Sequence, residues 1–237
     1  MSHDKNVSVT VFFPCHNEQE NVARTARQAL DVLSRISNDY EVIIVDDGST
    51  DLTGKISDDL ANENNNIKVV HHEVNKGYGA ALQSGFRAAT KNLVFYTDGD
   101  GQFDINEMPA LIPLMQDFDI VSCYRLNRRE GLMRKLNAWA WTKLVCFIFK
   151  MKIRDIDCAF KLFKREIFDN IQMQSTGALI DTEILARAIR KGYRITQSPV
   201  HHYPRVAGTQ SGANISVILR AFKELFKLKD QIAKDTQ

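Results

Sequence analysis

The chain has 237 residues, of which 44% are hydrophobic and 25% are charged, and this composition is typical of a globular domain rather than a disordered chain. A formal net charge of +2 provides no overall field for nucleic acid, so we expect anions to be bound by local basic clusters. Four cysteines without a C-x-x-C pair favour free thiols, and we expect a cytoplasmic protein.

Membrane-spanning segments are not expected. The first residues, MSHDKNVSVT, contain no apolar signal core. Lysines interrupt the most apolar stretch, residues 138–153, which is too short for the roughly 20 residues that a spanning helix needs.

Strand and helix patterns alternate in the first half of the chain. Apolar, β-branched or aromatic runs of strand length occupy residues 7–13, 40–45, 67–71, 93–96 and 120–123. Helical patterns occupy residues 22–33, 56–60 and 80–90. The alternation predicts an α/β fold in which a Rossmann-like, mostly parallel central sheet has helices on both faces. Ligands then bind beyond the carboxyl ends of the strands.

Polar segments follow the first four of these strands and are expected to meet at one edge of the sheet. The fourth, at residues 97–104, reads TDGDGQFD, and its Asp98, Asp100 and Gln102 offer the oxygen ligands that Mg²⁺ or Mn²⁺ prefers. An acidic turn is the alternative interpretation.

Two further segments suit a nucleotide. Asp47 in VDDGSTD (45–51) can accept hydrogen bonds from a nucleobase or ribose, although residues 49–51 can equally cap the next helix. Gly77 in NKGYG (75–79) allows a close approach to a diphosphate.

Basic residues gather in the second half. Arg125 and Arg134 belong to a cluster after the fifth strand, and Arg205 precedes the segment GTQSG (208–212), which contains Ser211. These arginines suit phosphate groups, or they form a solvated basic face. Residues 138–153 and 215–229 have the pattern of amphipathic helices, which predicts core packing or contact with a membrane surface.

Together these segments resemble family 2 glycosyltransferases, in particular the dolichol-phosphate mannosyltransferases and the bacterial polyprenyl-phosphate sugar transferases. The matching segments run in family order over most of the chain. They are PCHNE (14–18), VDDGSTD (45–51), NKGYGAALQSGF (75–86), TDGDGQFD (97–104), DIDCAFKLF (155–163), DTEILARA (181–188) and HHYPRVAGTQSG (201–212).

The resemblance implies a glycosyltransferase A fold in a single catalytic domain, 1–237, that binds a nucleotide sugar and a divalent ion. Residues 7–123 would form the nucleotide-sugar-binding half, and residues 124–237 the acceptor half. By position, the nucleotide would be lined by Pro14, His16, Glu18, Val45, Asp47, Gly77 and Gly99, and the metal by Asp98, Asp100 and Gln102. Phosphates of donor and acceptor would be held by Arg125, Arg134, Arg205 and Ser211, although this chain has Thr-Gln-Ser where relatives often carry Ser-Lys.

The acceptor determines whether the reaction needs a base. A lipid phosphate, with a second pKa near about 6, is already an anionic nucleophile, whereas a sugar hydroxyl requires a positioned carboxylate. The available acids are Asp155, Asp157, Asp181 and Glu183, which also suit a role in orienting loops. We therefore expect inverting transfer of a hexose to a polyprenyl or dolichyl phosphate. Membrane contact is expected to be peripheral, on the cytosolic face, or through an anchoring partner or a homo-oligomer.

Three alternatives stay open at this point. The acceptor can be a hydroxyl of a glycolipid or polysaccharide. The D-x-D stretch also resembles the strand-end motif of haloacid-dehalogenase phosphatases. The third alternative is a nucleotide-binding module without catalysis.

Overall fold

The computed structural model describes residues 7–126, 132–204 and 215–234, with the side chains of 132–135 and 215–223 left aside. Seven described strands form one sheet in the order β3-β2-β1-β4-β6-β5-β7. In chain order, they are β1 (Ser8–Cys15), β2 (Asp39–Asp46), β3 (Ile67–His71), β4 (Leu93–Thr97), β5 (Ile120–Leu126), β6 (Phe160–Lys164) and β7 (Ile195–His201).

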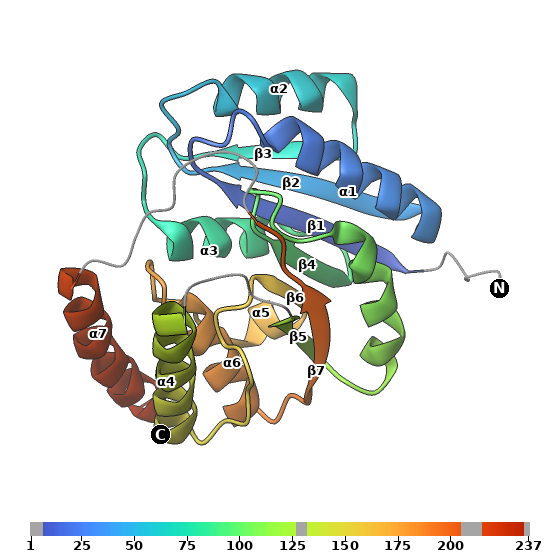
Figure 1. Cartoon of the computed structure of the whole chain (residues 1–237). Helices are drawn as coiled ribbons and strands as arrows, with labels where there is room; N and C mark the ends of the chain where they lie inside the picture. The colour runs from blue at the N-terminus through green and yellow to red at the C-terminus, as the bar shows by residue number, and fades with distance from the viewer. Residues whose placement is uncertain (1–6, 127–131, 205–214, 235–237) are drawn as a thin grey trace.

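Helices cover both faces of this sheet (Figure 1). They are α1 (Val22–Ile36), α2 (Thr53–Glu63), α3 (Tyr78–Ala88), the 3₁₀ segment η1 (Ile105–Gln116), α4 (Leu132–Phe149), α5 (Ile167–Asn170), α6 (Ile180–Arg190) and α7 (Ile215–Lys234). Buried residues of α1, α2 and η1 share one apolar cluster, and those of α3, α4, α6 and α7 share another. Helices α1, α2 and α3 and the segment η1 contact strands of the sheet, whereas α7 packs against α4 and α6.

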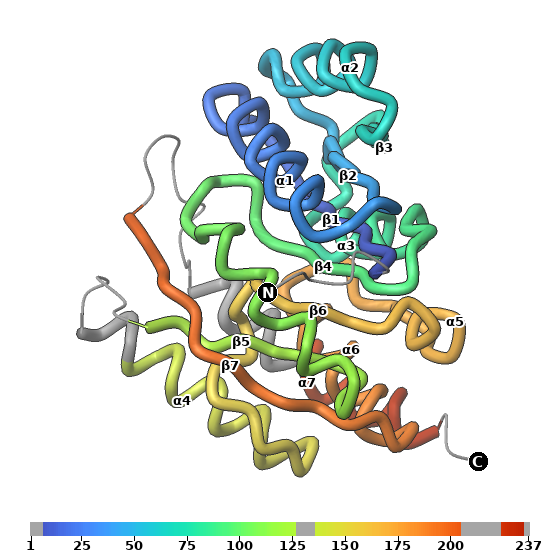
Figure 2. Tube along the Cα trace, turned by 90° about the vertical axis from the view of Figure 1, so that its right-hand side faces the viewer, coloured from blue at the N-terminus to red at the C-terminus, as the bar shows by residue number. Residues whose placement is uncertain are grey.

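The strand directions bring the loops of both halves to one edge. Strands β1 to β4 pair in parallel, whereas β6 lies antiparallel between β4 and β5. Because β6 runs in reverse, its first residue, Phe160, pairs with Thr97 at the end of β4. The loop that enters β6 therefore lies at the same edge as the segments that leave β1, β2, β4 and β5. In Figure 2, strands β1 to β3 and helices α1 to α3 occupy the upper part of the view, and helices α4, α6 and α7 occupy the lower part.

The expected fold is confirmed, with shifted element boundaries. The five predicted strands and the three helices predicted in the first half are present, and the two predicted amphipathic helices correspond to α4 and α7. Strand β1 continues through Pro14 to Cys15 because these residues still pair with β2. Strand β6 was not predicted, since FKLFK is short and contains two lysines, one of which, Lys161, is buried. Strand β7 was not predicted because ITQSPVH has little apolar character. Within the described residues, no helix has the length and apolar character needed to cross a membrane.

Candidate active site at the carboxyl edge of the sheet

The acidic segment after β4 packs closely against the end of β1. Gly99 is buried, and a Cβ atom there would lie 2.7 Å from the Sγ atom of Cys15 and 3.2 Å from the carbonyl oxygen of Pro14. Only a glycine leaves these atoms undisturbed. The tight packing fixes the backbone between Asp98 and Asp100, so both half-buried carboxylates are held at the strand end.

Electrostatics at this pair favour a cation. Burial, and then repulsion from Asp100, raise the pKa of Asp98 above its usual range. The hydroxyl of Tyr78 donates to Oδ1 of Asp98 over 3.1 Å and opposes that rise. Two like-charged carboxylates with oxygen donors only are the ligand type that Mg²⁺ and Mn²⁺ take, and a divalent ion would relieve their repulsion. In the part of the chain that the structure describes, no group of three or more His, Cys, Asp or Glu side chains that could hold a metal ion is found.

Gln102 joins the acidic segment to the segment after β7. Its backbone N–H donates to Oδ1 of Asp100 over 3.0 Å. Its side-chain nitrogen donates to the carbonyl oxygen of Tyr203 over 3.1 Å, and the N–H of Tyr203 donates to the carbonyl oxygen of Gln102 over 2.8 Å. The predicted contact between Gln102 and a metal stays a prediction.

Asp47 organises the loop that leads into α3. Its two carboxylate oxygens accept from the backbone N–H groups of Lys76 and Gly77, each over 2.9 Å. The ring of His72 lies 2.6 Å from the same carboxylate. Gly77 has a φ of 94°, a conformation that glycine adopts without strain. The structure thus gives Asp47 a supporting role that the sequence alone did not indicate, and its contact with a nucleoside stays a prediction.

The remaining nucleoside candidates differ in accessibility. His16 is exposed, and its Nδ1 atom lies 3.0 Å from the carbonyl oxygen of Asp47. Pro14 is half-buried, and the buried Glu18 accepts from Nδ2 of Asn21 over 2.7 Å. The side chain of Val45 is fully buried in the core, so it supports the strand end from below. The side chains of Arg134, Arg205 and Ser211 lie outside the described residues.

Arg125 is held by Asp155 in a two-pronged ion pair. Its Nε and Nη2 atoms donate to the two carboxylate oxygens over 2.7 Å and 2.8 Å. Both side chains are nearly buried, at 12% and 10% exposed. Attraction from Arg125 also opposes the rise in the pKa of Asp98, so this guanidinium contributes positive charge to the acidic site. Asp155 thereby orients a predicted phosphate-binding residue.

A buried lysine lies beneath the site. The ammonium of Lys161 donates to Oδ1 of Asp181 over 2.7 Å and to the carbonyl oxygens of Ile156 and Cys158 over 3.1 Å and 2.6 Å. The hydroxyl of Tyr96 also donates to Asp181. These contacts fix the loop before β6. Sequence reasoning missed Lys161, whose only signal is a lysine among the apolar residues of FKLF.

Glu183 stabilises the loop before α6 through hydrogen bonds. It accepts from the backbone N–H groups of Gln174 and Ser175 over distances from 2.6 to 3.1 Å, and from Nε of Arg187 over 2.8 Å. The carbonyl oxygens of Ser175 and Thr176 in turn accept from Gln83 and Gly79 of α3. Glu183 therefore connects the acceptor half to the helix that follows the Asp47 loop.

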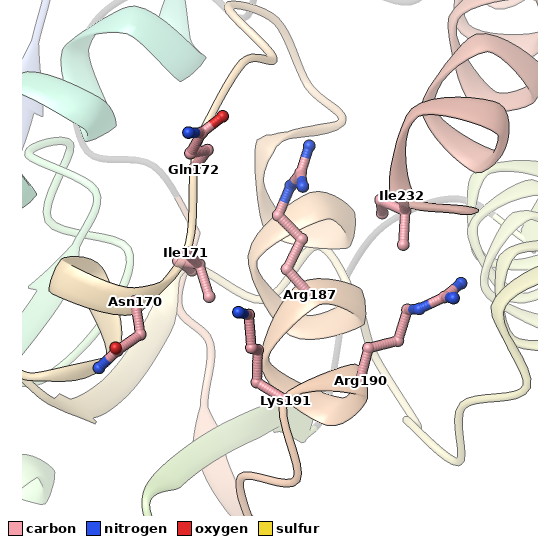
Figure 3. A pocket seen from close by; sticks show the side chains of 7 residues that line it. All are labelled: Asn170, Ile171, Gln172, Arg187, Arg190, Lys191 and Ile232. Atoms are coloured by element: carbon pink, nitrogen blue, oxygen red, sulfur yellow. The ribbon is translucent and has the colours of Figure 1, made fainter. Parts of the chain in front are cut away.

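A separate cavity of about 370 Å³ lies away from this edge (Figure 3). It lies between the residues that follow α5, the end of α6 and the end of α7. Its lining consists of Asn170, Ile171, Gln172, Arg187, Arg190, Lys191 and Ile232. Cations at the carboxyl end of a helix are stabilised by the helix dipole, which accounts for the basic lining without a ligand. None of the acidic site residues lines it.

The fold and the acidic strand end together define a glycosyltransferase A architecture. The chain belongs to glycosyl transferase family 2, whose family model matches residues 10–172. The match includes the D-x-D stretch, so the resemblance of this stretch to the haloacid-dehalogenase motif does not support assigning the chain to those phosphatases.

Curated relatives extend beyond this chain. Glycosyltransferase AglD of Haloferax volcanii is 31% identical over 209 residues, which cover 84% of this chain and 34% of the relative. An undecaprenyl-phosphate 4-deoxy-4-formamido-L-arabinose transferase of Salmonella choleraesuis is 29% identical over 206 residues, covering 84% of this chain and 61% of the relative. The chain thus spans between a third and two thirds of these relatives.

Solved structures support the fold. Glucosyl-3-phosphoglycerate synthase of Mycobacterium tuberculosis in complex with UDP has a TM-score of 0.69 at 16% identity, covering 96% of this chain and 80% of that one. The same enzyme with Mn²⁺, UDP-glucose and phosphoglyceric acid has a TM-score of 0.67 at 17% identity, covering 96% and 78%.

Proposed function

We propose that the chain is a metal-dependent inverting glycosyltransferase that moves a hexose from a UDP- or GDP-sugar to a polyprenyl phosphate or a similar lipid phosphate. We also propose that residues 1–237 act as one catalytic domain. The observation that carries this proposal is the meeting of Asp98 and Asp100 with the Asp47 loop and Arg125 at one edge of the sheet. The relatives named for transfer to undecaprenyl phosphate support the choice of acceptor.

Each part of the edge has a role in this proposal. Asp98, Asp100 and Gln102 would hold Mg²⁺ or Mn²⁺, which would supply a Lewis acid for the leaving diphosphate. The loop fixed by Asp47 lies against the nucleotide, with Gly77 close to the diphosphate. Arg125 neutralises phosphate charge, and its two hydrogen bonds to Asp155 keep the guanidinium in a fixed orientation. A dianionic lipid phosphate needs no base, so positioning and charge neutralisation suffice.

Helix α4 offers a surface for a membrane-bound acceptor. Leu136, Trp139 and Phe147 are 54%, 58% and 84% exposed on this helix. Lys143 and Lys150 are also exposed, and residues 131–154 contain no Asp or Glu. Aromatic and cationic side chains together suit the interface of an anionic bilayer. We expect Phe147→Glu to weaken sedimentation with phosphatidylglycerol vesicles several-fold, and unchanged sedimentation would contradict this contact.

The transfer itself is tested with purified protein, Mn²⁺, a panel of UDP- and GDP-hexoses, and a short polyprenyl phosphate such as farnesyl phosphate. We expect a labelled sugar to appear in the organic phase with one donor. Failure with every donor would overturn the lipid-phosphate acceptor. A hydroxyl acceptor is a second candidate, because burial and repulsion from Asp181 raise the pKa of Asp157, half-buried in the loop before β6, to about 6, which suits a base.

A further inference from the structure

A tyrosine joins the loop that leads into α3 to the acidic segment after β4. Tyr78 is the first residue of α3, and its hydroxyl donates to Oδ1 of Asp98 over 3.1 Å. The two residues belong to different connections of the sheet and lie 20 positions apart in the sequence. This hydrogen bond therefore links the segment expected to meet the diphosphate directly to the segment expected to hold the metal.

The backbone around Tyr78 is fixed on both sides. Before it, the N–H of Gly77 donates to the carboxylate of Asp47 over 2.9 Å. After it, the N–H of Gly79 donates to the carbonyl oxygen of Thr176 over 2.9 Å. The ring is half-buried and packs against the apolar cluster that contains residues of α3 and α6. The phenol therefore has a set position beside the carboxylate.

Packing explains the ring of Tyr78 but not its hydroxyl. A phenylalanine ring would fill the same apolar contact, whereas a phenol that leaves water has to be given a hydrogen-bond partner. An ionised carboxylate has no proton to give, so the phenol is the donor and Asp98 the acceptor. The hydroxyl is thus used on one of the two carboxylates expected to hold the metal.

This hydrogen bond sets the direction of the Asp98 carboxylate. The two oxygens of a carboxylate lie in one rigid plane, so a donor that holds Oδ1 also fixes where Oδ2 points. Asp100 is held in a comparable way, because its Oδ1 atom accepts from the backbone N–H of Gln102 over 3.0 Å. Groups that hold metal ligands by hydrogen bonds fix the geometry of those ligands, and losing such a group typically lowers metal affinity by about 10- to 100-fold.

We propose that Tyr78 is a positioning residue of the metal site, which aligns the carboxylate of Asp98 with the ion that Asp98 and Asp100 share. The proposal rests on the metal site of the proposed function, but not on the identity of the donor sugar or of the acceptor. Tyr78 does not ligate the ion in this proposal; it holds a ligand in place. Since Tyr78 directly follows Gly77, the loop fixed by Asp47 also places the phenol that holds Asp98.

The test measures Mn²⁺ binding from the electron paramagnetic resonance signal of the free ion, with and without UDP or GDP. Tyr78→Phe removes the hydroxyl and keeps the ring. We expect it to raise the dissociation constant of Mn²⁺ by about 10- to 100-fold, because Asp98 loses the donor that orients it. Tyr193→Phe is the matched control and should leave Mn²⁺ binding unchanged. Its hydroxyl accepts from Nδ2 of Asn170 over 3.0 Å, and Asn170 lines the separate cavity.

Rescue by excess metal separates positioning from a general structural effect. A weakened metal site fills when Mn²⁺ is raised, so most of the hexose transfer lost in Tyr78→Phe should return at about 100-fold more Mn²⁺. A loss of transfer that excess Mn²⁺ does not restore overturns the role of Tyr78. Unchanged Mn²⁺ affinity in Tyr78→Phe, or an equal loss of affinity in Tyr193→Phe, overturns it as well.

The same measurements keep this role distinct from the proposed function. Absence of Mn²⁺ binding in the wild type, even with nucleotide, overturns both the role of Tyr78 and the proposed metal site. If the wild type binds Mn²⁺ more tightly than Tyr78→Phe does, but transfers no hexose to farnesyl phosphate, the proposed acceptor fails while the role of Tyr78 stands.

Discussion

The two halves of the sheet hold their acidic residues in different ways. In the parallel half, the carboxylate of Asp47 is held mainly by backbone N–H groups that follow β3. In the half around β6, Asp181 is held by the buried ammonium of Lys161, and Glu183 by the guanidinium of Arg187 as well as by backbone N–H groups. Backbone contacts depend on loop shape, whereas side-chain ion pairs depend on particular residues at particular positions. We therefore expect substitution of a carboxylate to cost less stability in the parallel half, where loops can adjust, than in the half around β6.

The most damaging substitution is expected in the acceptor half. Asp181→Asn leaves the ammonium of Lys161 buried without its charge partner, in a pair whose side chains are 0% and 6% exposed. Breaking such a pair costs about 3–5 kcal/mol of the free energy of unfolding, measured by urea denaturation. The control is Asp169→Asn, in an exposed pair with Arg165, where we expect less than about 1 kcal/mol. Equal effects of the two substitutions would contradict a special role for buried pairs.

A smaller effect is expected for the backbone-held carboxylate. Asp47→Asn replaces one acceptor oxygen with a donor that faces a backbone N–H of Lys76 or Gly77. We expect a loss of about 1–3 kcal/mol in the free energy of unfolding, with weaker UDP or GDP binding by calorimetry. Asp58→Asn is a suitable control, because that carboxylate is 57% exposed beside His71. Stability and nucleotide affinity at wild-type levels would show that the loop does not depend on Asp47.

The contact between α3 and the loop before α6, which joins the two halves, gives a third comparison. A Cβ atom on Gly79 would lie 2.6 Å from the carbonyl oxygen of Ser175, so Gly79→Ala should force α3 away from the loop before α6. Overpacking of this kind costs about 1–3 kcal/mol in the free energy of unfolding. At Gly177, in the same loop, the nearest atom lies 3.9 Å away, and Gly177→Ala should change stability by less than about 0.5 kcal/mol. Similar changes in the free energy of unfolding for both variants would mean that the loop before α6 can move away from α3 without cost.

Much of the nucleotide half could be predicted from the sequence, for a physical reason. In a parallel sheet, polar residues after each strand meet at one edge, so chain order alone predicted that Asp47 and Asp98 lie at the same edge. Strand β6 breaks that rule, because it inserts antiparallel between β4 and β5. Nothing local in FKLFK indicates this pairing, so neither the buried Lys161 nor its effect on Asp181 could be predicted. The contact between Tyr78 and Asp98 also needed the structure, because the two residues lie 20 positions apart in the sequence.

The central claim is that Asp98 and Asp100 hold a divalent ion against the diphosphate of a sugar nucleotide. The direct measurement is a thermal-shift panel of UDP, GDP and dTDP, each with and without Mn²⁺, on the wild-type protein and on Asp100→Ala. Since a ligand that binds only the folded state raises the melting temperature, one nucleotide should raise it in the wild type only when Mn²⁺ is present. Asp100→Ala should lose that shift while keeping a similar melting temperature without ligand. A shift that does not depend on Mn²⁺, or that survives in Asp100→Ala, would contradict the assignment.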